Sequence, residues 1–138
     1  MKTIKLLSLF LLLTSLSGCS SSSNDNPTNS KINGVWNLRY VNGSIAGVNY
    51  VFEPGVVIWT FNSNSHLVTV ENNNTDNNLN PLLSSGVYPY TISNNQSTAS
   101  CGQSIEINSQ DMGCVLIDSD GLFITETFAD GFQIQLVR

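Results

Sequence analysis

The sequence predicts an all-β protein whose eight antiparallel strands close into an up-and-down barrel. From residue 31 onward, apolar and polar residues alternate with a period near two rather than 3.6, which is typical of strands. Turn-forming Gly, Asn, Asp and Pro residues separate these runs, and no stretch has a convincing helical pattern. Eight strands can close around a space that holds side chains or one small ligand. A two-sheet β-sandwich is the alternative.

The expected strands are short and follow one another through polar turns. Residues 43–55 are broken by three glycines and Pro54, and residues 72–81 form a polar loop. On the first strand, Trp36, Leu38 and Tyr40 are expected on one face. The predicted strands cover residues 34–42, 56–62, 66–71, 86–93, 104–108, 114–118, 122–128 and 132–138.

The hairpin between the last two strands allows a choice of register. A three-residue loop at 129–131 aligns Phe128 with Phe132 and Glu126 with Ile134, which gathers the apolar residues on one face. A two-residue turn at 130–131 would instead put threonines on that face. We therefore expect the first register, with Glu126 as the single acid on an apolar face.

The N-terminal segment has the features of a secretory signal. Two lysines precede an apolar run over residues 6–16 that is too short to span a bilayer. The run ends in Leu16-Ser17-Gly18-Cys19, which resembles the lipobox of bacterial lipoproteins. The resemblance implies that Cys19 is lipidated, with acyl chains such as palmitate, and becomes the mature N-terminus. A plain cleaved signal with an incidental cysteine is the alternative.

This interpretation divides the chain into three parts. Residues 1–18 are expected to be the lipoprotein signal peptide, and residues 19–30 the lipidated cysteine and a flexible Ser/Asn tether without apolar side chains. Residues 31–138 are expected to form one domain, because they suffice for a single core. Ser20, rather than Asp, follows the cysteine, which by resemblance to bacterial sorting rules favours the outer membrane. The periplasmic and the external face both stay open.

The charge of the mature chain limits its partners. Without the two lysines of the signal, three positive residues face ten acidic ones, a net charge of −7. A chain of this charge is repelled by nucleic acid and by anionic headgroups. We therefore expect no nucleic-acid partner, and membrane association through the lipid on Cys19.

The two cysteines of the mature domain favour a disulfide. Cys101 and Cys114 form an even pair, close in sequence, in a chain that is expected to be exported. Free thiols are the alternative. Zinc needs more ligands than these cysteines and the distant His66 supply. The sequence predicts no metal and no cofactor.

Catalysis has little support in the sequence. His66 is the one histidine, and nothing brings it to a particular nucleophile. The acids mostly lie in turns, where they are ordinary turn formers. The segment 118–121, Asp-Ser-Asp-Gly, has neither the spacing nor the closing glutamate of a calcium-binding EF-hand. We therefore do not expect an enzyme.

The first and last strands carry a second resemblance. Gly34-Val35-Trp36 resembles the Gly-x-Trp signature of lipocalins, and Arg138 matches the basic residue that packs over that tryptophan in the family. The wider pattern, including residues 41–43 and 45–50, resembles the lipocalin-like domains of Bacteroidota lipoproteins. The resemblance implies a lipocalin-like barrel over residues 31–138, with Gly34, Trp36 and Arg138 in structural roles. Longer lipocalins continue into a helix, so the cavity here is expected to be small, shallow or filled.

Two functions are compatible with such a barrel. The first is binding or carrying a small apolar ligand at the cell envelope, in a cavity with apolar walls and a few polar groups. The second is a filled barrel that binds a protein partner, as an accessory subunit or inhibitor, through residues 43–55 and 72–85. The residues expected to line the cavity, or else to fill the barrel, are Tyr40, Trp59, Phe61, Tyr88, Tyr90 and Glu126.

Overall fold

The computed structural model describes residues 27–94, 101–126 and 130–138. The predicted signal peptide, Cys19 and most of the predicted tether lie outside these residues. One short helix, α1 (Pro27–Ile32), precedes nine strands. The strands are β1 (Gly34–Gly43), β2 (Val48–Val51), β3 (Val57–Asn62), β4 (Leu67–Asn72), β5 (Gly86–Asn94), β6 (Gln103–Ile107), β7 (Gln110–Ile117), β8 (Leu122–Thr125) and β9 (Phe132–Val137).

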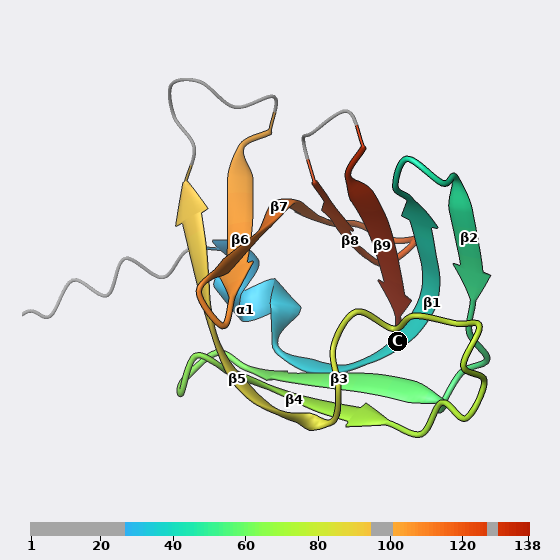
Figure 1. The fold of residues 1–138 in the computed structure, drawn as a ribbon. Helices are drawn as coiled ribbons and strands as arrows, with labels where there is room; N and C mark the ends of the chain where they lie inside the picture. Colours follow the sequence, from blue (N-terminus) through green and yellow to red (C-terminus); the bar gives the residue numbers. More distant parts are fainter. Residues whose placement is uncertain (1–26, 95–100, 127–129) are drawn as a thin grey trace, which may run out of the picture.

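The strands form a closed antiparallel barrel (Figure 1). Their order in the sheet is β2-β1-β3-β4-β5-β6-β7-β8-β9, and β1 also pairs with β9. Eight strands therefore close on themselves, while β2 is an extra strand outside the closed ring. This confirms the predicted eight-stranded up-and-down barrel and rules out the two-sheet alternative.

Every strand of the closed ring contributes buried side chains to a single core. Along β3, for example, buried and partly exposed residues alternate, as the period of two predicts. Ile32 of α1 and Phe52, which follows β2, join the same core from outside the ring. The buried core residues are Ile32, Trp36, Leu38, Val41, Phe52, Val57, Trp59, Phe61, Val68, Val70, Tyr90, Ile105, Ile107, Met112, Val115, Leu122, Ile124, Ile134 and Leu136.

A bulge in β1 corrects the predicted facing of Tyr40. The register with β9 shifts between Leu38 and Tyr40, so the next buried residue of β1 is Val41. Tyr40 is opposite Gln135, which lies between two buried residues of β9 and therefore faces outward. Tyr40 thus lies on the outer face, and its predicted place in the barrel interior is wrong.

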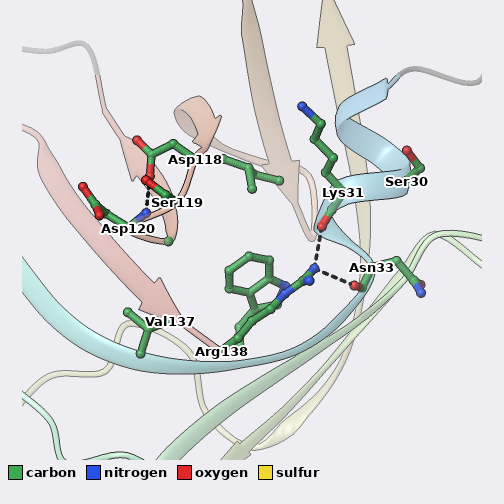
Figure 2. Close-up of a pocket in the computed structure, with 11 residues that line it drawn as sticks. Ser30, Lys31, Asn33, Asp118, Ser119, Asp120, Val137 and Arg138 are labelled. Carbon is green, nitrogen blue, oxygen red and sulfur yellow. Dashed lines mark hydrogen bonds between the residues drawn. The ribbon is translucent and has the colours of Figure 1, made fainter.

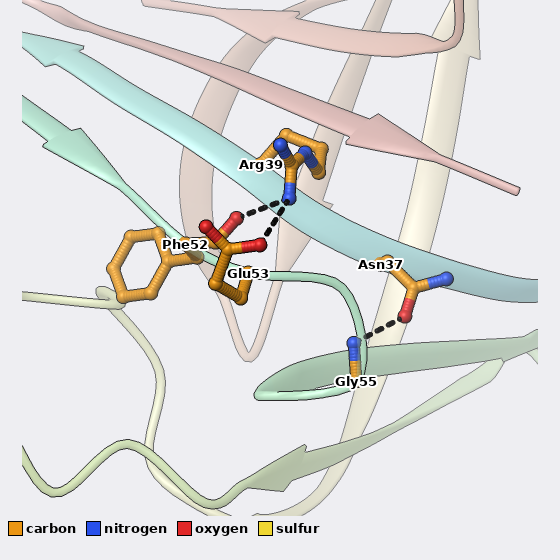
Figure 3. Close-up of polar contacts among 5 residues, drawn as sticks. All are labelled: Asn37, Arg39, Phe52, Glu53 and Gly55. Carbon is orange, nitrogen blue, oxygen red and sulfur yellow. Dashed lines mark hydrogen bonds and ion pairs between the residues drawn. The ribbon is translucent and has the colours of Figure 1, made fainter.

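The extra strand β2 lies in a segment for which the sequence predicts no regular structure. Tyr50 pairs with Val41, so β2 extends the second half of β1 while β3 pairs with the first half. Figure 3 shows how the segment after β2 is held: Arg39 Nη1 donates to Phe52 O at 2.6 Å and lies 3.9 Å from Glu53 Oε2. Four residues between glycine turns are too short a pattern to predict a strand.

The hairpin between β8 and β9 differs from the expected register by two residues. Ile124 pairs with Ile134 and Leu122 with Leu136, whereas the prediction aligns Glu126 with Ile134. The loop is longer, because Glu126 N donates to Phe132 O at 2.9 Å. A shift of two residues keeps the same side chains inside. The predicted faces are therefore correct although the predicted pairs are wrong, and Phe128 lies outside the described residues.

Strand β7 begins earlier than predicted. Asn108 and Ser109 both have positive φ, at 53° and 63°, and they join β6 to β7 in a two-residue turn of the kind that suits hairpins. Gln110 pairs with Ile107 directly after it. The sequence pattern misses this start because Gln110 and Asp111 are polar and exposed on their strand.

Helix α1 closes one end of the barrel. Its bounds place Pro27 and the residues up to 30, the last part of the predicted tether, in a helix. Thr28 Oγ1 donates to Gln103 Oε1 of β6, and Asn29 Nδ2 lies 3.3 Å from His66 Nε2 in the turn before β4. The buried Ile32 explains why the helix forms here: it covers apolar side chains that would otherwise face water.

The long polar segment between β4 and β5 covers the opposite end (Figure 1, yellow-green). Its asparagines fold it locally: Asn72 Oδ1 accepts from Asn74 N at 3.0 Å, and Asn80 Oδ1 from Leu82 N at 2.9 Å. These turns bring three partly buried leucines against the core: Leu79, Leu82 and Leu83. The segment is thus part of the packed structure, a role that the leucines among the asparagines could have indicated.

Glycine at position 113 provides a test of this fold. The φ of Gly113 is +92°, and a Cβ atom there would lie 2.2 Å from Thr125 O of the neighbouring strand. Gly113→Ala should therefore lower the free energy of unfolding by more than about 2 kcal/mol, measured by urea denaturation. Gly102→Ala is the matched control, because no atom lies within 4 Å of the position that its added methyl group would take, and its φ is not in the left-handed region. Equal effects of the two substitutions would contradict the β7–β8 pairing.

Candidate functional site

Trp36, Arg138 and the end of α1 meet at the end of the barrel that α1 covers (Figure 2). The guanidinium carbon of Arg138 lies 4.4 Å from the centre of the Trp36 ring. Its Nη2 donates to Lys31 O at 2.8 Å and to Asn33 O at 3.2 Å. Trp36 Nε1 donates to Ile32 O at 2.6 Å. Both side chains are therefore fixed to the backbone at the helix end.

The barrel topology explains this cluster. Because β1 pairs with β9, Leu38 is opposite Leu136 and Asn37 is opposite Val137, which brings Trp36 beside Arg138. A cation over an indole contributes about 0.5–2 kcal/mol. The packing of Arg138 over Trp36, expected from the resemblance, is present in the structure.

A depression of about 500 Å³ opens beside this cluster, between α1 and the turn from β7 to β8. Figure 2 shows Lys31 on one side and the turn with Asp118 and Asp120 on the other. Its lining combines both signs of charge with a small apolar area. The lining residues are Ser30, Lys31, Asn33, Trp36, Ile117, Asp118, Ser119, Asp120, Gly121, Val137 and Arg138.

The structure brings three of the predicted aromatic residues together inside the barrel. The rings of Phe61 and Tyr90 meet edge to face with centres 5.2 Å apart, and those of Trp59 and Phe61 lie 6.1 Å apart. All three side chains have at most 2% exposure. They are core residues in this structure, and no space for a water molecule lies beside Trp59.

Two polar atoms of this aromatic group have no hydrogen-bond partner among the described residues. Trp59 Nε1 and Tyr90 OH are both buried, and neither atom makes a hydrogen bond with a described residue. A buried polar group without a partner costs about 1–3 kcal/mol. Desolvation by burial also raises the pKa of the Tyr90 hydroxyl above its ordinary value. The core therefore contains two donors that a polar atom of a bound molecule could satisfy.

Tyr88 and Glu126 lie at the margin of the core and bond to nearby backbone. Tyr88 OH donates to Ser84 O at 3.0 Å. Glu126 Oε2 accepts from Phe132 N at 3.0 Å, so this carboxylate closes its own hairpin. With Tyr40 on the outer face, the six predicted residues do not line one common cavity.

Cys101 and Cys114 form a disulfide, the pairing that their spacing favours. A second depression, of about 590 Å³, lies beside it on the outer side of β7 and β8. Its apolar part includes Leu116, which is 59% exposed. The lining residues are Cys101, Gly102, Cys114, Val115, Leu116, Asp118, Phe123, Thr125 and Gln133.

His66 is exposed and lies in the turn directly before β4. Its φ is 55°, and its ring centre is 6.0 Å from that of Tyr90. Its Nε2 lies 3.3 Å from Asn29 Nδ2. In the described ranges, no group of three or more His, Cys, Asp or Glu side chains is placed to hold a metal ion.

Comparisons with known proteins give no relatives. No family model matches the chain, and neither a curated protein nor a solved structure matches it. Within the part of the chain that the structure describes, no helix has the length and apolar character needed to cross a membrane.

The unpartnered hydroxyl of Tyr90 yields a prediction on stability. Tyr90→Phe should leave the free energy of unfolding unchanged or raise it by about 1 kcal/mol, because it removes a desolvated hydroxyl. Tyr88→Phe is the matched control and should lower it by about 1 kcal/mol, because it loses the bond to Ser84 O. Urea denaturation measures both.

The same pair tests the pKa shift. Because the folded pKa of Tyr90 is above the ordinary 10.0, unfolding releases a proton above that pH. The wild-type protein should then lose stability as pH rises above 10, and Tyr90→Phe should lose less. A larger loss of stability in Tyr90→Phe than in Tyr88→Phe at neutral pH would contradict an unpartnered hydroxyl.

Proposed function

We propose that the protein is a lipid-anchored lipoprotein of the bacterial outer membrane whose lipocalin-like barrel is filled and binds a protein partner through its outer surface. The anchor rests on Leu16-Ser17-Gly18-Cys19 behind an apolar segment. Each buried methylene of the acyl chains contributes about 0.8 kcal/mol, and two or more chains give stable anchoring. The barrel would then be held at the membrane through its N-terminal side.

The packing of the barrel interior carries the second half of the proposal. A site for a small apolar ligand inside the barrel would need roughly 300–1,000 Å³ of largely enclosed apolar space. Here Leu38, Trp59, Ile105 and Ile124 have 0% exposure, so no water-sized space adjoins them. The two depressions lie at the barrel end and on its outer side.

Both ends of the interior are covered, which supports the same conclusion. Ile32 of α1 is fully buried at one end. At the other end, Phe52 and the three leucines of the segment between β4 and β5 pack against the core. A ligand would have to displace one of these covers and several core side chains. Residues 72–85 are expected to contact a partner. Deleting residues 72–80 would also remove Leu79 from the core, so a loss of partner binding after this deletion could reflect a damaged fold.

A second candidate function is binding of a small apolar ligand within the barrel. The unpartnered Trp59 Nε1 and Tyr90 OH favour it, because a polar atom of a ligand could accept from both. Such a ligand would be mostly apolar with one or two acceptors, and it would need movement of α1 or of the leucine-bearing segment. We propose no catalytic activity.

One mass-spectrometric experiment tests these proposals. The protein is purified in detergent from its own envelope after mild cross-linking of whole cells. We expect an N-terminal peptide that begins at Cys19 and carries acyl chains, one protein partner in constant ratio, and no stoichiometric small molecule in the organic extract. The absence of a small molecule from the extract counts as a result only if the barrel peptides are fully recovered.

The controls separate the parts of the proposal. Cys19→Ala should lose the acyl mass and the membrane fraction while the barrel still folds. An unmodified peptide in the wild-type chain would contradict the anchor. A stoichiometric small molecule that is lost in Tyr90→Phe would contradict the filled barrel and support the ligand-binding alternative. Absence of any cross-linked partner would contradict the binding function.

A further inference from the structure

The depression beside α1 has a positive wall that is held in place. Arg138 is fixed by the Trp36 ring and by two backbone carbonyls, which both accept from its Nη2. Among the residues described, the one ion pair joins Arg39 to Glu53, so no carboxylate side chain of this part of the chain forms an ion pair with Arg138 or Lys31. A guanidinium offers five N–H donors in a plane that matches a carboxylate. This wall therefore presents a fixed cation to any ligand in the depression.

The opposite wall is negative and is also held by hydrogen bonds. Asp118 Oδ1 accepts from Asp120 N at 2.8 Å, and Asp118 N donates to Gly121 O at 3.0 Å. Gln135 Nε2 donates to Asp120 O at 3.3 Å. The turn also needs Gly121, because a Cβ there would lie 2.3 Å from Leu136 O. The two aspartates thus extend from a turn that is bonded to β9.

These two walls select a ligand by its charge pattern. A simple anion in the depression would meet the aspartates, and a simple cation would meet Arg138 and Lys31. A zwitterion satisfies both walls, and a volume of about 500 Å³ has the size of a small-molecule site. Because hydrogen bonds already hold the Arg138 guanidinium and the Asp118 carboxylate, these two side chains need little ordering on binding.

We propose that this depression binds a small zwitterion of the amino-acid or short-peptide type. Its carboxylate binds Arg138 and Lys31, and its ammonium group binds Asp118 and Asp120. The site is separate from the barrel interior and does not depend on the proposed partner or on the lipid anchor.

An NMR titration tests the site directly. The full ¹⁵N-labelled chain in detergent micelles is titrated with the dipeptide Ala-Ala. Trp36 and Gly121 line the depression, so the signals of the Trp36 indole N–H and of the Gly121 amide should shift with ligand concentration. The chain has two tryptophans, and the indole N–H of Trp59 in the core is the internal control.

Blocked ligands and charge variants complete the test. N-acetyl-Ala-Ala lacks the ammonium group and Ala-Ala amide lacks the carboxylate, so each should bind at least about threefold more weakly. Asp120→Asn and Lys31→Gln should each raise the Kd about threefold, since an exposed ion pair is lost. Glu71→Gln on β4 removes an acid outside the depression and should leave the Kd unchanged.

Three results would overturn the proposal. The first is no shift of the Trp36 indole and Gly121 signals with Ala-Ala. The second is equal affinity for Ala-Ala and both blocked forms, which would remove the zwitterion requirement. The third is an unchanged Kd in both Asp120→Asn and Lys31→Gln, which would place the ligand elsewhere.

Discussion

The contact of Arg138 with Trp36 and the end of α1 joins the two termini of the barrel sheet. Trp36 is on the first strand and Arg138 directly follows the last, so their stacking fixes the strand pair at which the barrel closes. The same guanidinium donates to the carbonyls at the end of α1. Because helix carbonyls at this end lack intrahelical partners, a cation there is favourable. Closure of the sheet and covering of its end are thus one arrangement.

Because both ends of the barrel are covered, its buried aromatic residues belong to the core and do not line an open cavity. Trp59, Phe61 and Tyr90 fill the interior, with ring centres 5.2 and 6.1 Å apart, rather than lining an open cup. Eight strands leave a width that such side chains can occupy completely. Binding is therefore proposed at the outer surface, where charged and polar groups stay hydrated until a partner arrives. The unpartnered donors of Trp59 and Tyr90 are the feature of the core that points to a ligand instead.

Sequence alternation predicted the fold class because inward and outward residues of a barrel strand differ in polarity. The resemblance to lipocalins placed Trp36 and Arg138 together, and the even pair of cysteines in the predicted domain favoured a disulfide. Alternation failed where one residue changes its phase, as at the bulge before Tyr40, and where a loop length sets the register, as after Glu126. The charged depression was not predicted, because its two walls come from residues distant in sequence that only the closed barrel brings together.

The dependence of barrel closure on Arg138 is tested most directly by the stability of Arg138→Gln beside that of Lys31→Gln. Arg138 loses its stacking on Trp36 and two hydrogen bonds to backbone carbonyls, so urea denaturation should give a loss of about 1–3 kcal/mol. Lys31 takes part through its backbone carbonyl, which the substitution retains, so its loss should be within about 0.5 kcal/mol. Equal losses for the two variants would contradict a barrel whose closure depends on Arg138.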